Sequence, residues 1–143
     1  MAKYLLDHYV AEACKEPWKI QAWSAGASAL EGMRASEETQ RLLRAMGIDT
    51  SAHRAQRLTD EMIREADHIF VMEEFHREII CSRVPDACSN VHLLKTFQAP
   101  RPVPPSQAGI VDPIGKPLEV YEICFATIKE AIERVGHWLL EEL

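Results

Sequence analysis

The sequence contains no long apolar run, no C-x-x-C pair and no excess of basic residues. No stretch approaches the roughly 20 apolar residues that a membrane span requires, and the first residues lack the apolar segment of a signal peptide. The formal net charge of -6 argues against non-specific nucleic-acid binding, which needs basic side chains to neutralise phosphates. We therefore expect a cytoplasmic protein with neither a membrane nor a nucleic acid as partner.

The four cysteines, Cys14, Cys81, Cys88 and Cys124, do not have the spacing of a metal site. No pair of histidines lies at ligand spacing near them. We expect four reduced and largely buried thiols, no metal and no cofactor. A zinc-binding or thiol-redox protein is the weakest of the alternatives.

A capping residue is also missing where the first helix begins. The spacing of the apolar residues predicts an amphipathic helix over Met1–Cys14. No Ser, Thr, Asp or Asn precedes it to accept a hydrogen bond from the free N–H groups of the first turn. Because these groups and the helix dipole attract anions, chemistry often sits at such a helix end.

The remaining chain alternates helices with short apolar strands. Ser36 and Thr59 are the expected N-caps of two helices, and Gly47 is expected to end the first of these. The expected strands are Ile20–Ser24, Ile69–Met72 and Val91–Leu94, the further helices are Glu73–Arg83 and Leu118–Leu143, and the proline-rich stretch Ala99–Pro117 is a long loop.

This alternation predicts an α/β fold, a three-layer sandwich with a short parallel sheet and helices on both faces. Residues 1–143 are expected to form one domain, because no repeat or linker divides them. Only three strands are visible, which is few for so many helices. We therefore expect that a strand is missing and that its place in the sequence lies before Met1.

The candidate residues for chemistry lie in loops. Asp112 opens the order Asp-Pro-Ile-Gly, which predicts a type I turn and is most often only that. An acid on a stiff loop can also donate a proton to a leaving group. His53 and Arg54 belong either to a solvated polar loop or to a phosphate site. Ser24 follows a strand, at the edge of the sheet where ligands bind in α/β folds.

The ordered set of motifs resembles the low-molecular-weight protein tyrosine phosphatase family, which includes bacterial protein arginine phosphatases. Each motif is weak alone, but the set runs along essentially the whole chain. The matching segments are Ser24-Ala25-Gly26, Gly47-Ile48-Asp49, Ser51 to Ala55, Gln56 to Thr59, Asp67 to Met72, Val91 to Leu94, and Asp112-Pro113.

The resemblance implies a mechanism and a substrate class. In this family a first strand leads into a loop of the form Cys, five residues, Arg, Ser, whose thiolate forms a cysteinyl-phosphate. Asp112 matches the aspartate that protonates the leaving group and then activates water. Ser24 and His53 match positions that hydrogen-bond to the phosphate loop and hold its shape. The implied substrate is a phosphorylated protein or a small phosphoester.

No Cys-x5-Arg occurs in the 143 residues, so the nucleophile and the anion-binding loop are absent from this chain. We expect it to be inactive in this form. One hypothesis is a phosphatase truncated at its N-terminus, and the alternative is a catalytically dead binding or regulatory module. Ile114 stands where tyrosine phosphatases of the family usually have an aromatic residue, so phosphoarginine, or another small phosphoester or oxyanion, is at least as good a candidate as phosphotyrosine.

The missing strand also has a physical consequence. In the family it lies in the middle of a four-stranded sheet, between the strands that Ile20–Ser24 and Ile69–Met72 resemble. We therefore expect exposed strand edges, lowered stability and a tendency to self-associate.

Overall fold

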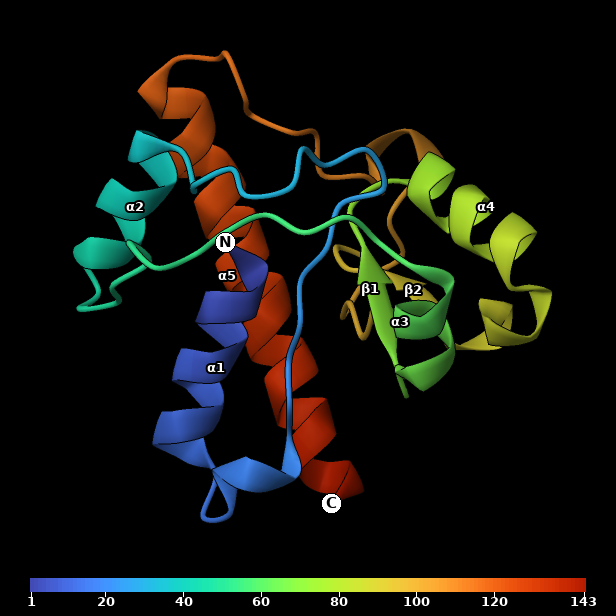
Figure 1. Ribbon diagram of the computed structural model, residues 1–143. Coiled ribbons are helices and arrows are strands. Elements are labelled where there is room, and N and C mark those ends of the chain that lie inside the picture. The colour runs from blue at the N-terminus through green and yellow to red at the C-terminus, as the bar shows by residue number, and fades with distance from the viewer.

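The computed structural model describes residues 1–143 and has an α/β architecture (Figure 1). The helices are α1 (Ala2–Ala13), α2 (Glu37–Arg44), α3 (Asp60–Glu65), α4 (Glu74–Arg83) and α5 (Leu118–Glu142), with short 3-10 helices η1 (Pro17–Lys19), η2 (Pro85–Asn90) and η3 (Pro105–Gln107). The strands are β1 (Ile69–Val71) and β2 (Val91–Leu93). The predicted fold class is confirmed. No helix combines the length and the apolar character that a membrane span requires.

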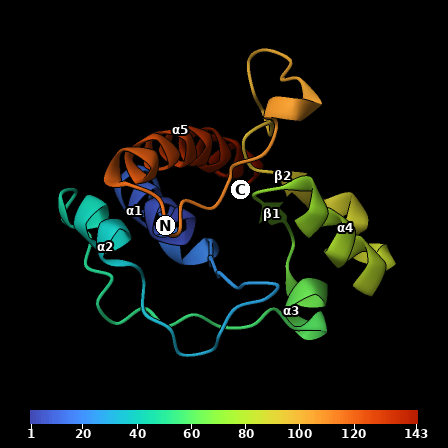
Figure 2. The same ribbon diagram turned by 90° about the horizontal axis from the view of Figure 1, so that it is seen from above.

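The two strands form a small parallel sheet that has helices on both faces. Figures 1 and 2 both show α1, α2 and α5 on one side of the sheet and α3 and α4 on the other. The α3–α4 face is sealed by the buried residues Ile63, Val71, Ile80, Val84, Ala87 and Val91. The opposite face is covered by a larger core that includes Leu5, Leu43, Leu94, Cys124, Ile128, Ala131 and Val135.

The helix ends follow the local chemistry of the sequence. The Ser36 hydroxyl accepts a hydrogen bond from the Thr39 N–H at 3.2 Å, and the Thr59 hydroxyl accepts one from the Met62 N–H at 3.2 Å. Gly47 follows α2 with φ of +78°, a conformation that suits glycine at a helix end. Both predicted caps and the predicted stop are therefore confirmed. Met1 at the start of α1 provides no side-chain cap, as the sequence indicated.

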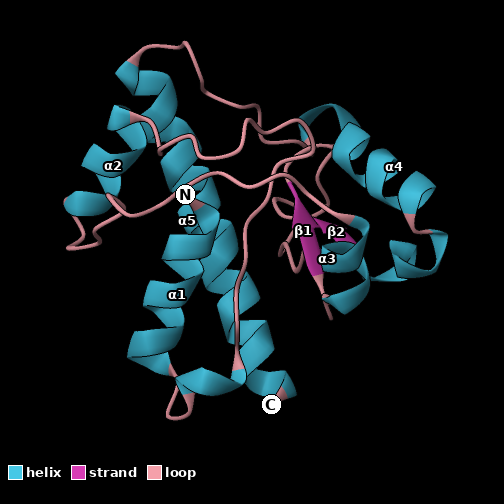
Figure 3. Cartoon of the chain, in the orientation of Figure 1, coloured by secondary structure: helices cyan, strands magenta, loops and turns pink.

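The predicted strand Ile20–Ser24 is not formed, and the sheet has two strands rather than three (Figure 3). A strand is stabilised by hydrogen bonds to a neighbour, and the peptide groups of Gln21, Ala22 and Trp23 make none in the structure. The alternating pattern of Ile20–Ser24 is compatible with a β-strand, but no neighbouring strand is present to form its hydrogen bonds.

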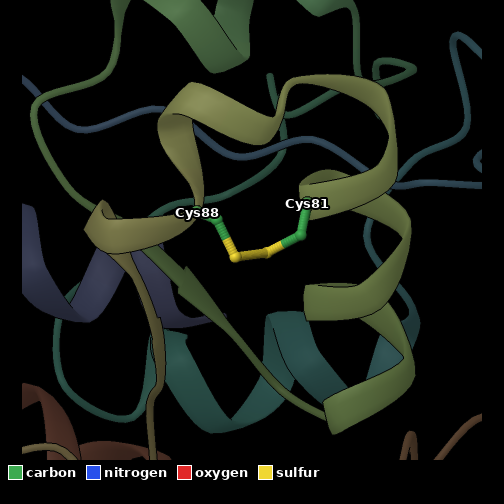
Figure 4. Close-up of a disulfide and its surroundings, with 2 residues drawn as sticks. All are labelled: Cys81 and Cys88. Atoms are coloured by element: carbon green, nitrogen blue, oxygen red, sulfur yellow. A yellow bond between two sulfur atoms is a disulfide. The ribbon is translucent and has the colours of Figure 1, made fainter.

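The prediction of four reduced thiols is also wrong. Cys81, in the last turn of α4, and Cys88, in η2, form a disulfide (Figure 4). Their Cα atoms are 4.8 Å apart, within the range that a disulfide spans, because the chain turns back at Pro85. Cys14 and Cys124 remain free. Sequence spacing alone could not reveal the pairing, since it does not show how η2 folds over the end of α4.

Candidate active site

The loop that carries Asp112 is anchored at the carboxyl end of β1. The Ile110 N–H donates to the Met72 carbonyl at 2.8 Å, which brings the next residues over the edge of the sheet. Asp112 itself is exposed, and its Oδ1 accepts a hydrogen bond from the Ile114 N–H at 3.0 Å. The carboxylate is therefore held by its own loop, in a position open to solvent.

The type I turn predicted to start at Asp112 is not formed, and a different turn starts one residue later. The hydrogen bond runs from the Lys116 N–H to the Pro113 carbonyl at 2.9 Å, so Pro113 opens the turn instead of Asp112. Gly115 then occupies the third position with φ of +75°, which glycine adopts without strain. The Asp112 side chain still accepts a hydrogen bond from the Ile114 N–H two residues on, an interaction by which aspartate mimics a turn, and the backbone turn follows one residue later.

His53 lies against the first turn of α1. Its ring meets the ring of Tyr4 edge to face, with 5.5 Å between centroids. The surrounding loop is closed by Arg54, whose Nη1 donates to the Ser51 carbonyl at 2.9 Å and to the His53 carbonyl at 2.7 Å. The Arg54 guanidinium therefore donates its hydrogen bonds to backbone carbonyls of its own loop and to no other element.

Electrostatic effects link four groups at the start of α1. Burial, and then the positive charge of the Met1 ammonium, lower the pKa of His53 below 6.5. Burial raises the pKa of the Cys124 thiol, and the negative charge of Asp112 raises it further. Burial lowers the pKa of the Met1 ammonium, and the charge of the Cys124 thiolate acts on that pKa in the opposite direction. The packing agrees with these influences, because Met1 and Tyr4 pack against the core cluster that contains Cys124 and His53 contacts Tyr4, so these groups lie around the N-terminal end of α1.

Ser24 joins this region through an intermediary. Its carbonyl accepts a hydrogen bond from Gln56 Nε2 at 2.8 Å, and the neighbouring Gly26 N–H donates to the Gln56 carbonyl at 3.0 Å. Gln56 is three residues beyond His53, so the two loops are tied together. No hydrogen bond directly joins the side chains of Ser24, His53 and Asp112 in this structure.

Sequence reasoning missed three residues of this region. Tyr4 lies in the predicted first helix and Gln56 in a segment that resembles the family. Nothing in the sequence indicates that Tyr4 contacts His53 or that Gln56 bonds to Ser24. Cys124 is part of the apolar stripe of α5, and its distance from Asp112 along the chain hides their proximity. No group of three or more metal-ligating side chains comes together.

None of the cysteines is a thiolate nucleophile beside Asp112. Cys81 and Cys88 are bonded to each other, and Cys124 is buried with a raised thiol pKa, which disfavours the reactive thiolate. Cys14 caps the far end of α1, about 18 Å from the start of that helix at 1.5 Å per residue. The site therefore contains an acid and polar groups and no sulfur nucleophile from this chain.

Comparison with known proteins decides the family. The model of the low molecular weight phosphotyrosine protein phosphatase family matches residues 1–143. The chain belongs to this family. A protein-arginine-phosphatase of Geobacillus stearothermophilus is 33% identical over 123 residues, which cover 86% of this chain and 79% of the relative.

Other family members agree in sequence and fold. A probable low molecular weight protein-tyrosine-phosphatase, EpsP of Ralstonia nicotianae, is 29% identical over 143 residues, covering 93% of each protein. The solved structure of the YwlE arginine phosphatase from Geobacillus stearothermophilus has a TM-score of 0.83 and 30% identity, covering 99% of this chain and 84% of that one. A family phosphatase from T. tengcongensis has a TM-score of 0.81 and 29% identity, covering 99% and 88%.

Proposed function

We propose that this chain carries the acid half of a protein phosphatase that cleaves phosphomonoesters or phosphoarginine through a cysteinyl-phosphate. Asp112 protonates the leaving group and then takes a proton from the hydrolytic water. Ser24 and His53 hold the shape of the phosphate-binding loop. The observation that carries the proposal is that the Asp112 loop is anchored at the carboxyl end of β1 while His53 lies against Tyr4 in the first turn of α1, an uncapped helix end where anions bind well.

We further propose that the 143 residues alone do not turn over substrate, because none of the four cysteines provides a thiolate beside Asp112. We propose that the missing strand, which leads into the Cys-x5-Arg loop, pairs with the free edge of β1. In the parallel ladder the Val71 carbonyl accepts from the Leu94 N–H at 2.9 Å, so the peptide groups of Phe70 point to the free edge. A strand in that place would also pair with Ile20–Ser24, which makes no strand pairing in this structure.

The substrate side chain is proposed to be non-aromatic, with phosphoarginine preferred over phosphotyrosine. Val111 and Ile114, which flank Asp112, are 72% and 71% exposed and present aliphatic surface instead of an aromatic wall. One relative is a protein-arginine-phosphatase, and others are tyrosine phosphatases, so both remain substrates to compare. We propose a cytoplasmic location for this activity.

The test adds a family strand and Cys-x5-Arg-Ser loop before Met1 and measures hydrolysis of an aryl phosphate and of phosphoarginine. We expect the extended protein to be active, the 143-residue chain to be inactive, and Asp112→Asn to lower kcat of the extended protein by about a hundredfold or more. Reading the coding sequence upstream of Met1 is an independent check. Enzymatic turnover by the 143-residue chain would contradict the proposal.

The alternative proposal is a catalytically dead phosphatase-like module that binds a partner. It is favoured if the extended protein folds and still fails to cleave either substrate. The two proposals therefore predict opposite outcomes of the same experiment.

A further inference from the structure

The outer side of α2 has a hollow that the proposed chemistry does not use. Its volume is about 660 Å³, and it is lined by Arg34, Ala35, Glu37, Gln40, Arg41 and Arg44. The four helical members are spaced three and four residues apart, so they lie on one face of α2. Gln40 Nε2 donates to the Ala35 carbonyl at 2.8 Å and fixes the segment that carries Arg34 against the helix.

The three guanidinium groups of the hollow make no ion pair or hydrogen bond within the protein, although the pKa of the Asp49 carboxyl, lowered mainly by hydrogen bonds from Ser51, is lowered further by the positive charge of Arg44. No ion pair and no side-chain hydrogen bond in the structure involves Arg34, Arg41 or Arg44. Glu37 is the only carboxylate in the lining. The hollow is therefore locally cationic in a chain whose formal net charge is -6.

The composition of the hollow selects among ligands. Arg41 and Arg44 lie in the last turn of α2, where they also complement the helix dipole, but this does not account for Arg34, which precedes the helix. The lining has no aromatic side chain to stack on a nucleobase and only Ala35 as an apolar member. Guanidinium groups bind carboxylates through paired hydrogen bonds, so acidic side chains fit this surface.

We propose that Arg34, Arg41 and Arg44 form a docking surface for an acidic segment of the protein substrate, near its phosphorylated residue. The proposal deepens the phosphatase function proposed above and rests on it. Figures 1 and 2 both show α2 beside the start of α1, so one extended polypeptide can contact the helix and the Asp112 region together.

The test measures binding without catalysis. A fluorescent peptide in which Asp and Glu alternate with Gly is titrated with the 143-residue protein, and its anisotropy is compared with that of the Asn and Gln version. We expect the acidic peptide alone to bind, with an affinity that falls as salt is raised. In the Arg41→Gln/Arg44→Gln protein the dissociation constant rises about tenfold, since exposed guanidinium–carboxylate pairs contribute modestly.

The matched control is Arg64→Gln/Arg101→Gln, which removes two exposed positive charges outside the hollow. It leaves peptide binding unchanged, and circular dichroism checks that all variants keep their helices. Equal weakening by both double variants, no binding of the acidic peptide, or binding of a single-stranded oligonucleotide in its place overturns the proposal. Because no turnover is needed, loss of docking is distinct from failure of the extended protein to cleave phosphate.

Discussion

At the scale of single residues, the buried Thr50 hydroxyl makes no hydrogen bond, although Thr50 is only 3% exposed. A buried polar atom without a partner costs free energy. We expect Thr50→Val to raise the free energy of unfolding by about 1 kcal/mol in urea titrations. Thr59→Val is the control with the opposite sign, since it removes the cap of α3 and costs about 1 kcal/mol. A destabilised Thr50→Val protein would show that the hydroxyl has a partner.

Two histidines predict how stability depends on pH. Burial is the main reason that the pKa values of His53 and His92 lie below 6.5, with nearby positive charge, including His68 for His92, as a further cause. Because the unfolded chain binds protons more readily than these folded sites, stability is complete above pH 6.5 and decreases as the pH falls below it. Thermal melts from pH 7.5 downward measure this loss.

The contribution of His53 to this loss can be separated from the rest. His53→Gln should flatten the part of the pH dependence that lies between pH 6.5 and the lowered pKa of His53. Identical profiles for the wild type and His53→Gln would mean that His53 does not sense the folded environment.

At the scale of elements, the contact between α1 and α5 depends on one glycine. A Cβ at Gly136 would lie 3.1 Å from Tyr9 Cγ and closer still to two other ring carbons. Gly136→Ala should therefore lower the free energy of unfolding by about 1 to 3 kcal/mol, despite the better helix propensity of alanine. Urea unfolding measures the change. The double variant Tyr9→Ala/Gly136→Ala should cost less than the sum of the single changes, and simple additivity would contradict the steric explanation.

The elements also show how far sequence patterns predict this fold. The N-caps Ser36 and Thr59 and the apolar runs of β1 and β2 are local signals, so both helix starts and both strands were predictable. The disulfide and the register of the Pro113–Lys116 turn depend on how separate segments meet, which spacing does not specify. The prediction of a strand at Ile20–Ser24 failed because alternating apolar and polar residues indicate the two faces of a strand and do not show whether a neighbouring strand is present to pair with it.

The candidate site divides in the same way. Ser24, His53 and Asp112 were singled out from their motifs, and their proposed roles remain predictions. Their surroundings were not predictable, because Tyr4, Gln56 and Cys124 reach the site only through the packing of α1 and α5 and the pairing of two loops. The unpaired arginines of α2 carry no sequence motif at all.

At the scale of the whole molecule, unpaired peptide groups at Gln21–Trp23 and at Phe70 predict self-association. Sedimentation velocity should show a dimer fraction that rises with protein concentration. Trp23, 47% exposed within the extended segment, is the residue to change: Trp23→Lys should weaken association by about tenfold. Trp18→Lys, at a 74% exposed tryptophan of η1, is the control that should not. A monomer at every concentration would contradict the prediction.

The Cys81–Cys88 bond closes a ring that contains Arg83, whose side chain reaches back to Asp60 at 2.7 Å. In a tryptic digest of unfolded, unreduced protein, hydrolysis after Arg83 opens the ring and leaves the two fragments covalently attached through sulfur. Mass spectrometry then records a single species that divides in two only after a thiol is added, and so reports the oxidation state of this corner of the molecule in any preparation.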